Sequence, residues 1–325
     1  MHKETLKDIG EKELIRRISL FMPVNQTKDD CALFKVKKSN ILINTDLMVE
    51  DTHFNKYIMT PHDIGWKATT TNISDLISSG CDEIIGITIG LVLSPNTNWE
   101  WVENLYKGIN EALQSYGGSI LGGDCTRGSK NMVSISALGT QGEINLRRYA
   151  CKPNEILLTS GVHGLSKLGL LLKNKEIKDD QIFPDSLIIK ALETFSRPKP
   201  KVEILKNIIK SRNKYDKKKI GCTDTSDGLY QAALDLATSS NCSVIIDYKK
   251  LPKEIGWPEG PQWDNYYFFG GEDYELLFSL PEKWAKRLQK ENKNIREIGL
   301  ITRGQPQVKI KNKEYELNTN SYSHF

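Results

Sequence analysis

The chain has 325 residues, with 45 Lys and Arg against 41 Asp and Glu, a formal net charge of +4 and 38% hydrophobic residues. This length favours about two domains with a substantial buried core. The weakly positive balance, without a basic stripe interleaved with aromatics, argues against nucleic-acid binding, and no apolar run reaches the length of a membrane span.

Apolar and alternating segments predict strands in the first half. They cover residues 31–37, 40–46, 84–93, 119–124 and 131–140. The second strand is expected to end at Thr45 and Asp46, and the fourth to run into a turn at Gly122 and Gly123.

Helices are expected over residues 11–22, 60–79 and 98–116. Thr60 as the cap and Pro61 in the first position mark the start of the second helix, which runs to about Ser79. Asn72 and Asp75 lie three residues apart on one face of it. The helix dipole disfavours an anion such as Asp75 in the C-terminal half of a helix, and a cation there would remove this conflict.

A turn within residues 142–153 favours a boundary between an N-terminal domain of residues 1–145 and a C-terminal domain of residues 146–325. Beyond it, the patterns predict strands over 155–161, 243–248, 274–280 and 295–302, and helices over 163–174, 201–212, 224–239 and 282–292. The stretch 251–263 is rich in Pro and Gly and is expected to be a surface connection. Both halves mix strands and helices, which favours an α/β or α+β fold.

Cysteine usage and the first residues both favour a cytoplasmic protein. The six cysteines form no C-x-x-C pair, so neither a zinc site nor a compact disulfide framework is predicted. The opening segment MHKETLKDIGEKELIRR is charged and has no apolar centre, so we expect no signal peptide.

Carboxylates recur beside glycine, hydroxyl or amide neighbours at six places. These are residues 29–30, 45–46, 72–75, 122–124, 224–227 and 270–273. Mg²⁺ prefers oxygen ligands, commonly one or two carboxylates with phosphates and water, and glycines let a polyphosphate approach the backbone. Together the clusters suggest a phosphate–metal site, although each alone is equally compatible with a turn, a helix cap or an exposed helix face.

Several familiar motifs do not fit. GDCTRGSK, residues 123–130, is close to a P-loop, but its Ser and Lys are reversed and a strand pattern follows where a helix is needed. The chain has no H-E-x-x-H and no G-x-S-x-G, so neither a metalloprotease nor a hydrolase elbow is predicted.

Six segments in order, DDCALF, NTDLMVEDTHF, NISDLISSGCD, LGGDCTRG, DTSDGL and GGEDYELLF, resemble the thiamine-monophosphate kinase family of the aminoimidazole ribonucleotide synthetase-like ATP-binding superfamily. The resemblance extends to the closing SYSHF. It implies a two-domain fold whose N-terminal mixed sheet forms a barrel across a homodimer. It also implies transfer of the ATP γ-phosphoryl group to thiamine monophosphate, with several Mg²⁺ ions, to give thiamine diphosphate and ADP.

The resemblance also implies three sets of site residues. The metal ligands are Asp30, Asn44, Thr45, Asp46, Asp75, Asp124, Asp224 and Asp227. The nucleotide contacts are Tyr106, Gly123, Asp124, Arg148 and Ser226, and the substrate contacts are His53, Glu272 and Tyr322. No catalytic base is expected, because a phosphate monoester acceptor with a second pKa of about 6 is largely ionised near neutral pH.

The chain departs from the family pattern at Lys28, Asn44, Leu165 and Ala232. The first two touch the metal region and leave the number of ions open. Selenophosphate synthetase is disfavoured because no reactive N-terminal cysteine motif precedes the first cluster, and the hydrogenase-maturation relative because the chain ends in SHF. A non-catalytic Mg–nucleotide-binding regulator remains an alternative, although it would not need His53 or Glu272.

Overall fold

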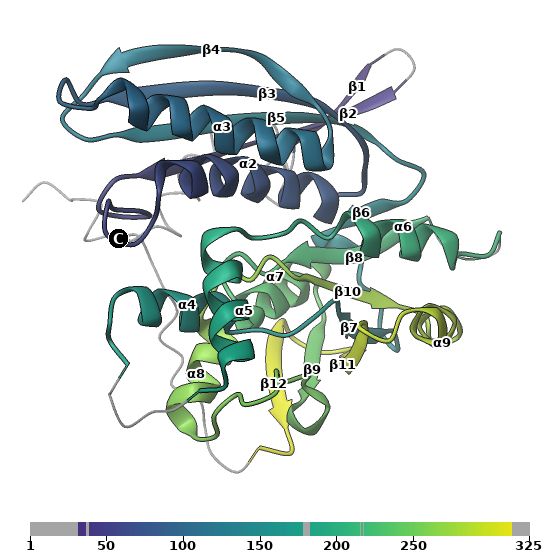
Figure 1. Cartoon of the computed structure of the whole chain (residues 1–325). Helices are drawn as coiled ribbons and strands as arrows, with labels where there is room; N and C mark the ends of the chain where they lie inside the picture. The colour runs from purple at the N-terminus through teal and green to yellow at the C-terminus, as the bar shows by residue number, and fades with distance from the viewer. Residues whose placement is uncertain (1–31, 37–38, 178–182, 215, 217, 314–325) are drawn as a thin grey trace, which may run out of the picture.

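The computed structural model describes residues 32–36, 39–177, 183–214, 216 and 218–313. These residues form two sheets, one in each half of the chain, and helices pack on both (Figure 1). No helix in the described ranges is long and apolar enough to cross a membrane. The predicted helix over residues 11–22 lies outside them.

The N-terminal half is a five-stranded sheet covered on one face by two helices. Its elements are β1 (Ala32–Val36), β2 (Ser39–Val49), α2 (Pro61–Ser78), β3 (Cys81–Leu93), α3 (Trp99–Tyr116), β4 (Ser119–Arg127) and β5 (Met132–Gln141). The strand order is β1-β2-β5-β3-β4, antiparallel except for the parallel pair β3–β4. Helices α2 and α3 lie side by side on the sheet (Figure 1).

The two faces of this sheet differ in burial. Towards the helices, Leu42 of β2 and Ile135 of β5 are fully buried. On the opposite face, Leu47 and Leu121 are each 50% exposed, and β4 is exposed along its whole length. Apolar side chains are therefore left uncovered on one face of the N-terminal sheet within the described part of the chain.

Helix α2 begins where the sequence predicts. Thr60 caps it through a hydrogen bond of 3.1 Å from the backbone N–H of Asp63, and Pro61 is its first residue. At the other end, the Arg147 guanidinium donates to the carbonyl of Ser79 at 2.8 Å. This buried arginine places a positive charge at the C-terminal end of the helix, where the helix dipole favours it.

Glycines allow α2 and α3 to touch through their backbones. A Cβ on Gly65 would lie 2.0 Å from the carbonyl oxygen of Leu105, and a Cβ on Gly108 would lie 1.9 Å from that of His62. Any side chain at either position would separate the two helices, so their spacing is fixed by these contacts.

The C-terminal half is built on a seven-stranded mixed sheet. Its strands are β6 (Asn145–Arg147), β7 (Ile156–Thr159), β8 (Lys219–Asp224), β9 (Ser243–Asp247), β10 (Leu276–Leu280), β11 (Arg296–Thr302) and β12 (Gln307–Lys311), in the order β12-β9-β11-β7-β10-β8-β6. Its helices are η3 (Arg148–Ala150), α4 (Leu165–Lys173), α5 (Asp185–Ser196), α6 (Val202–Lys210), α7 (Leu229–Ser240), η4 (Tyr248–Lys250), α8 (Pro261–Phe269) and α9 (Glu282–Glu291).

Several predicted boundaries are wrong. Strand β2 continues through Thr45 and Asp46, because the next residues, Leu47 to Val49, still pair with β5. Strand β4 likewise runs through 122–124 instead of turning there, since it pairs with β3 along its length. Strand β8 ends at Asp224 and a loop follows, so α7 begins only at Leu229 and not at residue 224.

The sequence analysis did not predict helices α5 and α8, strands β6, β8 and β12, or the short helices η3 and η4. The stretch 251–263 is also not simply a surface connection, because Trp257 and Trp263 in it are 7% and 6% exposed. Their rings pack against each other at a centroid distance of 5.9 Å. Aromatic burial therefore outweighs the turn-forming Pro and Gly residues in this segment.

Candidate active site

The centre of β2 is tied to α2 by side-chain amides. Asn44 donates from Nδ2 to Asp75 Oδ2 at 2.7 Å and to Asn72 Oδ1 at 3.1 Å. The backbone N–H of Asp46 donates to the same Asn72 oxygen at 3.2 Å. Asn72 is fully buried, so this face of α2 points into the site and the exposed-face alternative is wrong for Asn72.

A second carboxylate reaches α2 from the C-terminal half. Asp224 is the last residue of β8 and is 2% exposed. Its Oδ2 accepts a hydrogen bond of 2.5 Å from the hydroxyl of Ser74. The alternative that Asp224 or Ser226 caps a helix is wrong, because α7 starts after Gly228 without a side-chain cap.

Glu272 lies on a tight turn that packs on the loop after β8. Gly271, Glu272 and Tyr274 all have positive φ values, of 69°, 58° and 49°, a conformation that costs energy for residues other than glycine. The N–H of Glu272 donates to the carbonyl of Ser226 at 2.6 Å. Glu272 is therefore held beside the residues 224–227 that the sequence links to metal and nucleotide.

The Glu272 carboxylate is paired with a lysine that the sequence analysis did not single out. Lys67 of α2 lies 2.9 Å from it, and the lysine side chain is only 2% exposed. Lys67 stands seven residues before Ser74 and eight before Asp75, so all three share one face of the helix. This helical spacing from Ser74 and Asp75 was the one signal in the sequence that could have identified Lys67.

Tyr274 marks the place where carboxylates of both halves come together. Burial raises the pKa of its hydroxyl well above the usual value, and the nearby charges of Glu272, Asp46, Asp224 and Asp75 raise it further. Two of these acids come from the N-terminal half and two from the C-terminal half. Four predicted site residues are thus close enough to act on one buried group.

Other predicted ligands lie farther from this cluster. The Thr45 hydroxyl is hydrogen bonded to that of Ser136 at 2.6 Å. Asp124 is on the exposed edge strand β4, opposite Gly90 of β3. Three strand steps separate β4 from β2, which is roughly 14 Å. Within one chain, the structure does not bring Asp124 to Asp46.

The neighbouring Gly123 is packed tightly on β3. A Cβ there would lie 2.0 Å from the carbonyl oxygen of Ile89, so no side chain fits. Asp227, by contrast, is exposed on the loop before α7.

Arg148 and His53 are positioned at two edges of the site. Arg148 donates from Nε to the Thr223 hydroxyl at 3.0 Å and lies 3.6 Å from Asp235, which places it beside the end of β8. His53 follows β2, and its Nδ1 accepts a hydrogen bond of 3.1 Å from the N–H of Val49. Asp30 and Tyr322 lie outside the described residues.

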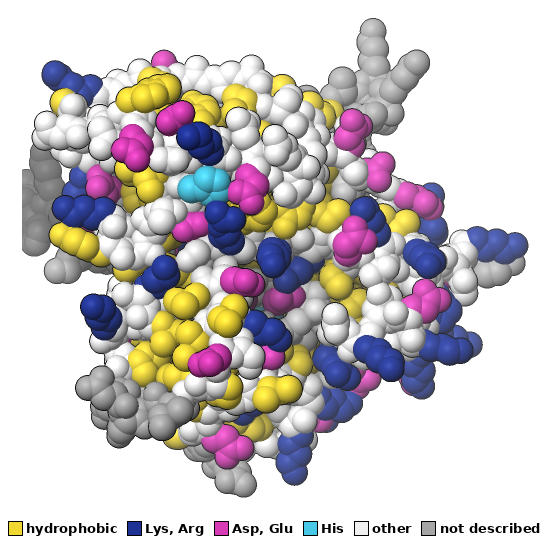
Figure 2. All heavy atoms as spheres, viewed as in Figure 1, with side chains coloured by type: hydrophobic (Ala, Val, Ile, Leu, Met, Phe, Trp, Pro, Cys, Tyr) yellow, Lys and Arg dark blue, Asp and Glu magenta, His cyan; other side chains and the backbone are white. Residues whose placement is uncertain are grey.

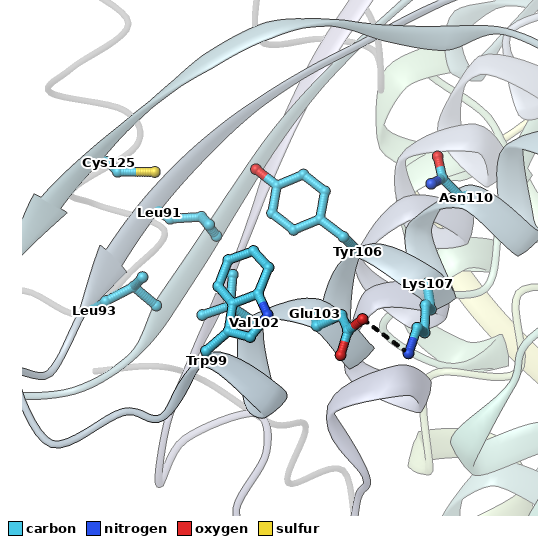
Figure 3. A pocket seen from close by; sticks show the side chains of 9 residues that line it. All are labelled: Leu91, Leu93, Trp99, Val102, Glu103, Tyr106, Lys107, Asn110 and Cys125. Carbon is cyan, nitrogen blue, oxygen red and sulfur yellow. Dashed lines mark ion pairs between the residues drawn. The ribbon is translucent and has the colours of Figure 1, made fainter.

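A cavity of about 510 Å³ opens between α3 and the strands β3 and β4 (Figure 3). It is lined by Leu91, Leu93, Trp99, Val102, Glu103, Tyr106, Lys107, Asn110 and Cys125. The rings of Trp99 and Tyr106 point into it, while Glu103 and Lys107 form an ion pair of 3.3 Å (Figure 3). Burial raises the pKa of Tyr106, and the charge of Cys125 adds to this shift. Cys125 follows Asp124 on β4, and because successive side chains of a strand point to opposite faces, the Asp124 carboxylate points away from this mainly apolar cavity.

The fold and the four carboxylates around Tyr274 define the class of protein, as comparison with known families shows. A family model for the N-terminal domain of AIR synthase related proteins matches residues 28–141. A thiamine-monophosphate kinase of Prochlorococcus marinus is 43% identical over 303 residues, covering 93% of this chain and 91% of that protein. A thiamine-monophosphate kinase of Bacillus subtilis is 30% identical over 91% of this chain and 92% of its own. The chain belongs to the thiamine-monophosphate kinase family.

Solved structures agree with this assignment. AaThiL complexed with AMPPCP and TMP superposes with a TM-score of 0.85 at 27% identity and covers 100% of both chains. The thiamine monophosphate kinase of Aquifex aeolicus gives a TM-score of 0.79 at 28% identity and covers 96% of this chain and 100% of its own. The hydrogenase maturation protein HypE has a similar fold, with a TM-score of 0.65 at 16% identity and 89% of this chain and 90% of its own covered.

Proposed function

We propose that this chain transfers the γ-phosphoryl group of ATP to the phosphate of thiamine monophosphate, giving thiamine diphosphate and ADP. Family membership and the relative complexed with AMPPCP and TMP support this. The observation that carries it is the meeting of Asp46 and Asp75 with Asp224 and Glu272 around Tyr274. Carboxylates that meet from two halves of a chain can hold Mg²⁺, which suits a reaction between two phosphates.

The donor set fits Mg²⁺. The side-chain oxygen of Asn44 is buried and has no hydrogen-bond partner among the described residues, and its amide nitrogen holds Asp75 at 2.7 Å. Asn44, Asp46, Asp75 and Asp224 would hold the metal, with Asp30, Thr45, Asp124 and Asp227 as further proposed ligands of several ions. Bound Mg²⁺ supplies the positive charge that lets two phosphates approach.

The proposed ligands within the described residues do not form a closed metal site. In the described part of the chain, no three Asp, Glu, His or Cys side chains are grouped closely enough to hold a metal ion by themselves. Mg²⁺ commonly binds through one or two carboxylates and completes its shell with phosphates and water. The arrangement therefore suits ions that arrive with a nucleotide.

The chain's own residues bind and orient the two substrates. We assign the base of ATP to the cavity around Tyr106, and its phosphates to Gly123, Asp124, Arg148 and Ser226. Acceptor contacts are assigned to His53, Glu272 and Tyr322. Two unit charges about 4 Å apart repel by roughly 4 kcal/mol at an effective dielectric of 20, so orientation and charge compensation are the main tasks. No general base is required, because the acceptor phosphate is largely ionised near neutral pH.

We further propose a cytoplasmic homodimer in which a second copy covers the open face of the N-terminal sheet and the two sheets form a barrel. The exposed side chains of Leu47 and Leu121 support this, because apolar groups on such a face favour burial. A division of the chain into residues 1–145 and 146–325 is supported by the sheet change between β5, which ends at Gln141, and β6, which starts at Asn145.

The test is a coupled assay of ADP release with Mg²⁺ and ATP, with thiamine monophosphate present or absent and with free thiamine as the control. We expect ADP release only with the monophosphate, together with thiamine diphosphate as a product. Equal ADP release with and without thiamine monophosphate would remove the substrate assignment.

A further inference from the structure

Lys67 is a buried cation that links the two halves of the chain. Its Nζ lies 2.9 Å from Oε2 of Glu272 and donates to the carbonyl of Phe195 at 3.1 Å. It also lies 4.5 Å from the centroid of the Phe195 ring. Lys67 is 1% exposed as a residue, so its charge is satisfied by these groups and not by bulk water.

The setting explains how the lysine side chain is held in place. Phe195 is in the last turn of α5, where free carbonyls and the helix dipole favour a cation. The ring face of Phe195 adds a further attraction. Lys67 extends from α2 in the N-terminal half. Its ammonium group is held by two segments of the C-terminal half, the end of α5 and the turn that carries Glu272.

The partner of this lysine is less constrained. Glu272 has a side chain that is 35% exposed and sits on a turn with positive φ. One of its oxygens is paired with Lys67, which leaves the other available to a ligand. Charged side chains of both signs also lie together along the junction of the two halves on the face seen in Figure 2.

We infer that Lys67 is a positioning residue for the acceptor: by pairing with Oε2 it fixes the Glu272 carboxylate so that this group contacts thiamine monophosphate. The inference rests on the proposed function, in which Glu272 contacts the acceptor. Without the lysine, the carboxylate would lose its fixed orientation and would face the negative charges of Asp46, Asp75 and Asp224 uncompensated.

The test compares Lys67→Met, Glu272→Gln and the double variant. Removing a group that orients only the acceptor site raises the KM for thiamine monophosphate, here by about ten-fold, and leaves the KM for ATP unchanged. If Lys67 acts through Glu272, the double variant is no worse than the poorer single variant. Lys67→Arg keeps the charge and is expected to restore part of the affinity.

Arg197→Met is the matched control. Arg197 follows α5 and pairs with Asp63 of α2 at 2.8 Å, so it joins the same two helices without touching Glu272. We expect it to lower stability and leave both KM values unchanged. Should Lys67→Met fail to fold, the uncharged Lys67→Gln replaces it in the same comparison.

Two results would overturn the inference. One is an equal rise in the KM values of ATP and thiamine monophosphate. The other is a full Lys67→Met effect in the Glu272→Gln background. Calorimetric titration with thiamine monophosphate distinguishes failure of the Lys67 inference from failure of the proposed function. A parent protein that binds it without turnover contradicts only the kinase assignment, and the variants still test Lys67; a parent that does not bind it contradicts both.

Discussion

Ser74 and Asp224 are joined by a hydrogen bond of 2.5 Å between Oγ and Oδ2, although 150 residues separate them in the chain. Ser74 is 1% and Asp224 is 2% exposed. A buried carboxylate needs such partners, because desolvation penalises its charge. The contact therefore places a proposed metal ligand of the C-terminal half against the helix that carries Asp75.

Ser74→Ala is expected to leave the buried Asp224 oxygen without this donor. We expect the free energy of unfolding to fall by about 1–3 kcal/mol, and the Mg²⁺ concentration for half-maximal activity to rise. Urea unfolding and a Mg²⁺ titration of turnover measure the two effects. Thr70→Ala is the control, because among the described residues the Thr70 hydroxyl bonds only to carbonyls of its own helix. Identical Mg²⁺ dependence in Ser74→Ala and parent would contradict this role.

Asp46→Asn removes a negative charge from the centre of the site and keeps the size of the side chain. We expect turnover at low Mg²⁺ to fall by about 100-fold or more, and to recover partly at high Mg²⁺. A Mg²⁺-dependent shift in melting temperature gives a readout that does not need turnover. Asp82→Asn, on the exposed part of β3, should behave like the parent. Wild-type turnover of Asp46→Asn at low Mg²⁺ would exclude Asp46 as a ligand.

Because of the buried His163, we expect the folded protein to lose stability in acid. Burial, with a contribution from the charge of Lys201, lowers its pKa to about 3. The unfolded chain therefore binds more protons between pH 3 and about 6.5, and stability falls as the pH falls, by up to 1.4 kcal/mol per unit. We expect His163→Gln to lose roughly 2 kcal/mol less than the parent between pH 7 and 5 in urea unfolding.

The opposing effect of Asp273 cancels in that comparison. Burial raises the pKa of Asp273 to about 7, so its folded form binds a proton more tightly than the unfolded chain and favours stability at low pH. Asp273 is present in both proteins. His62→Gln keeps His163 and should retain the loss in acid, whereas equal slopes for parent and His163→Gln would refute the prediction.

Leu47→Glu tests the open face of the N-terminal sheet. A charge at this 50% exposed position should prevent burial against a second copy, and the mass measured by light scattering should fall from dimer to monomer. Ile189→Glu, at a 56% exposed position on α5, should leave the mass unchanged. A dimeric Leu47→Glu protein would show that the copies meet elsewhere.

Local signals predicted the start of α2 and the i, i+3 pair of Asn72 and Asp75, because caps and helical spacing depend on neighbouring residues. The position of Asp46 was not predicted correctly. A polar pair was read as a strand end, while the pairing of β2 with β5 carries the strand three residues further. Pairing with β5, which the local pattern does not contain, decided the outcome.

The candidate site was predicted as a set of residues but not as a geometry. The pairing of Lys67 with Glu272 spans 205 residues, and no periodicity reports a contact at that distance. The sequence also placed Asp124 among the other carboxylates without indicating that two strands lie between β4 and β2. Such relationships arise only when both sheets are assembled.

Helices α2 and α3 pack backbone to backbone at Gly65 and Gly108, where a Cβ would meet a carbonyl oxygen of the other helix. Tyr106 lines the cavity from α3, and Lys67 holds Glu272 from α2. In the proposed function these two residues serve ATP and thiamine monophosphate, so the helix pair sets the distance between the two sites. A side chain at Gly65 or Gly108 would separate the helices and so change that distance.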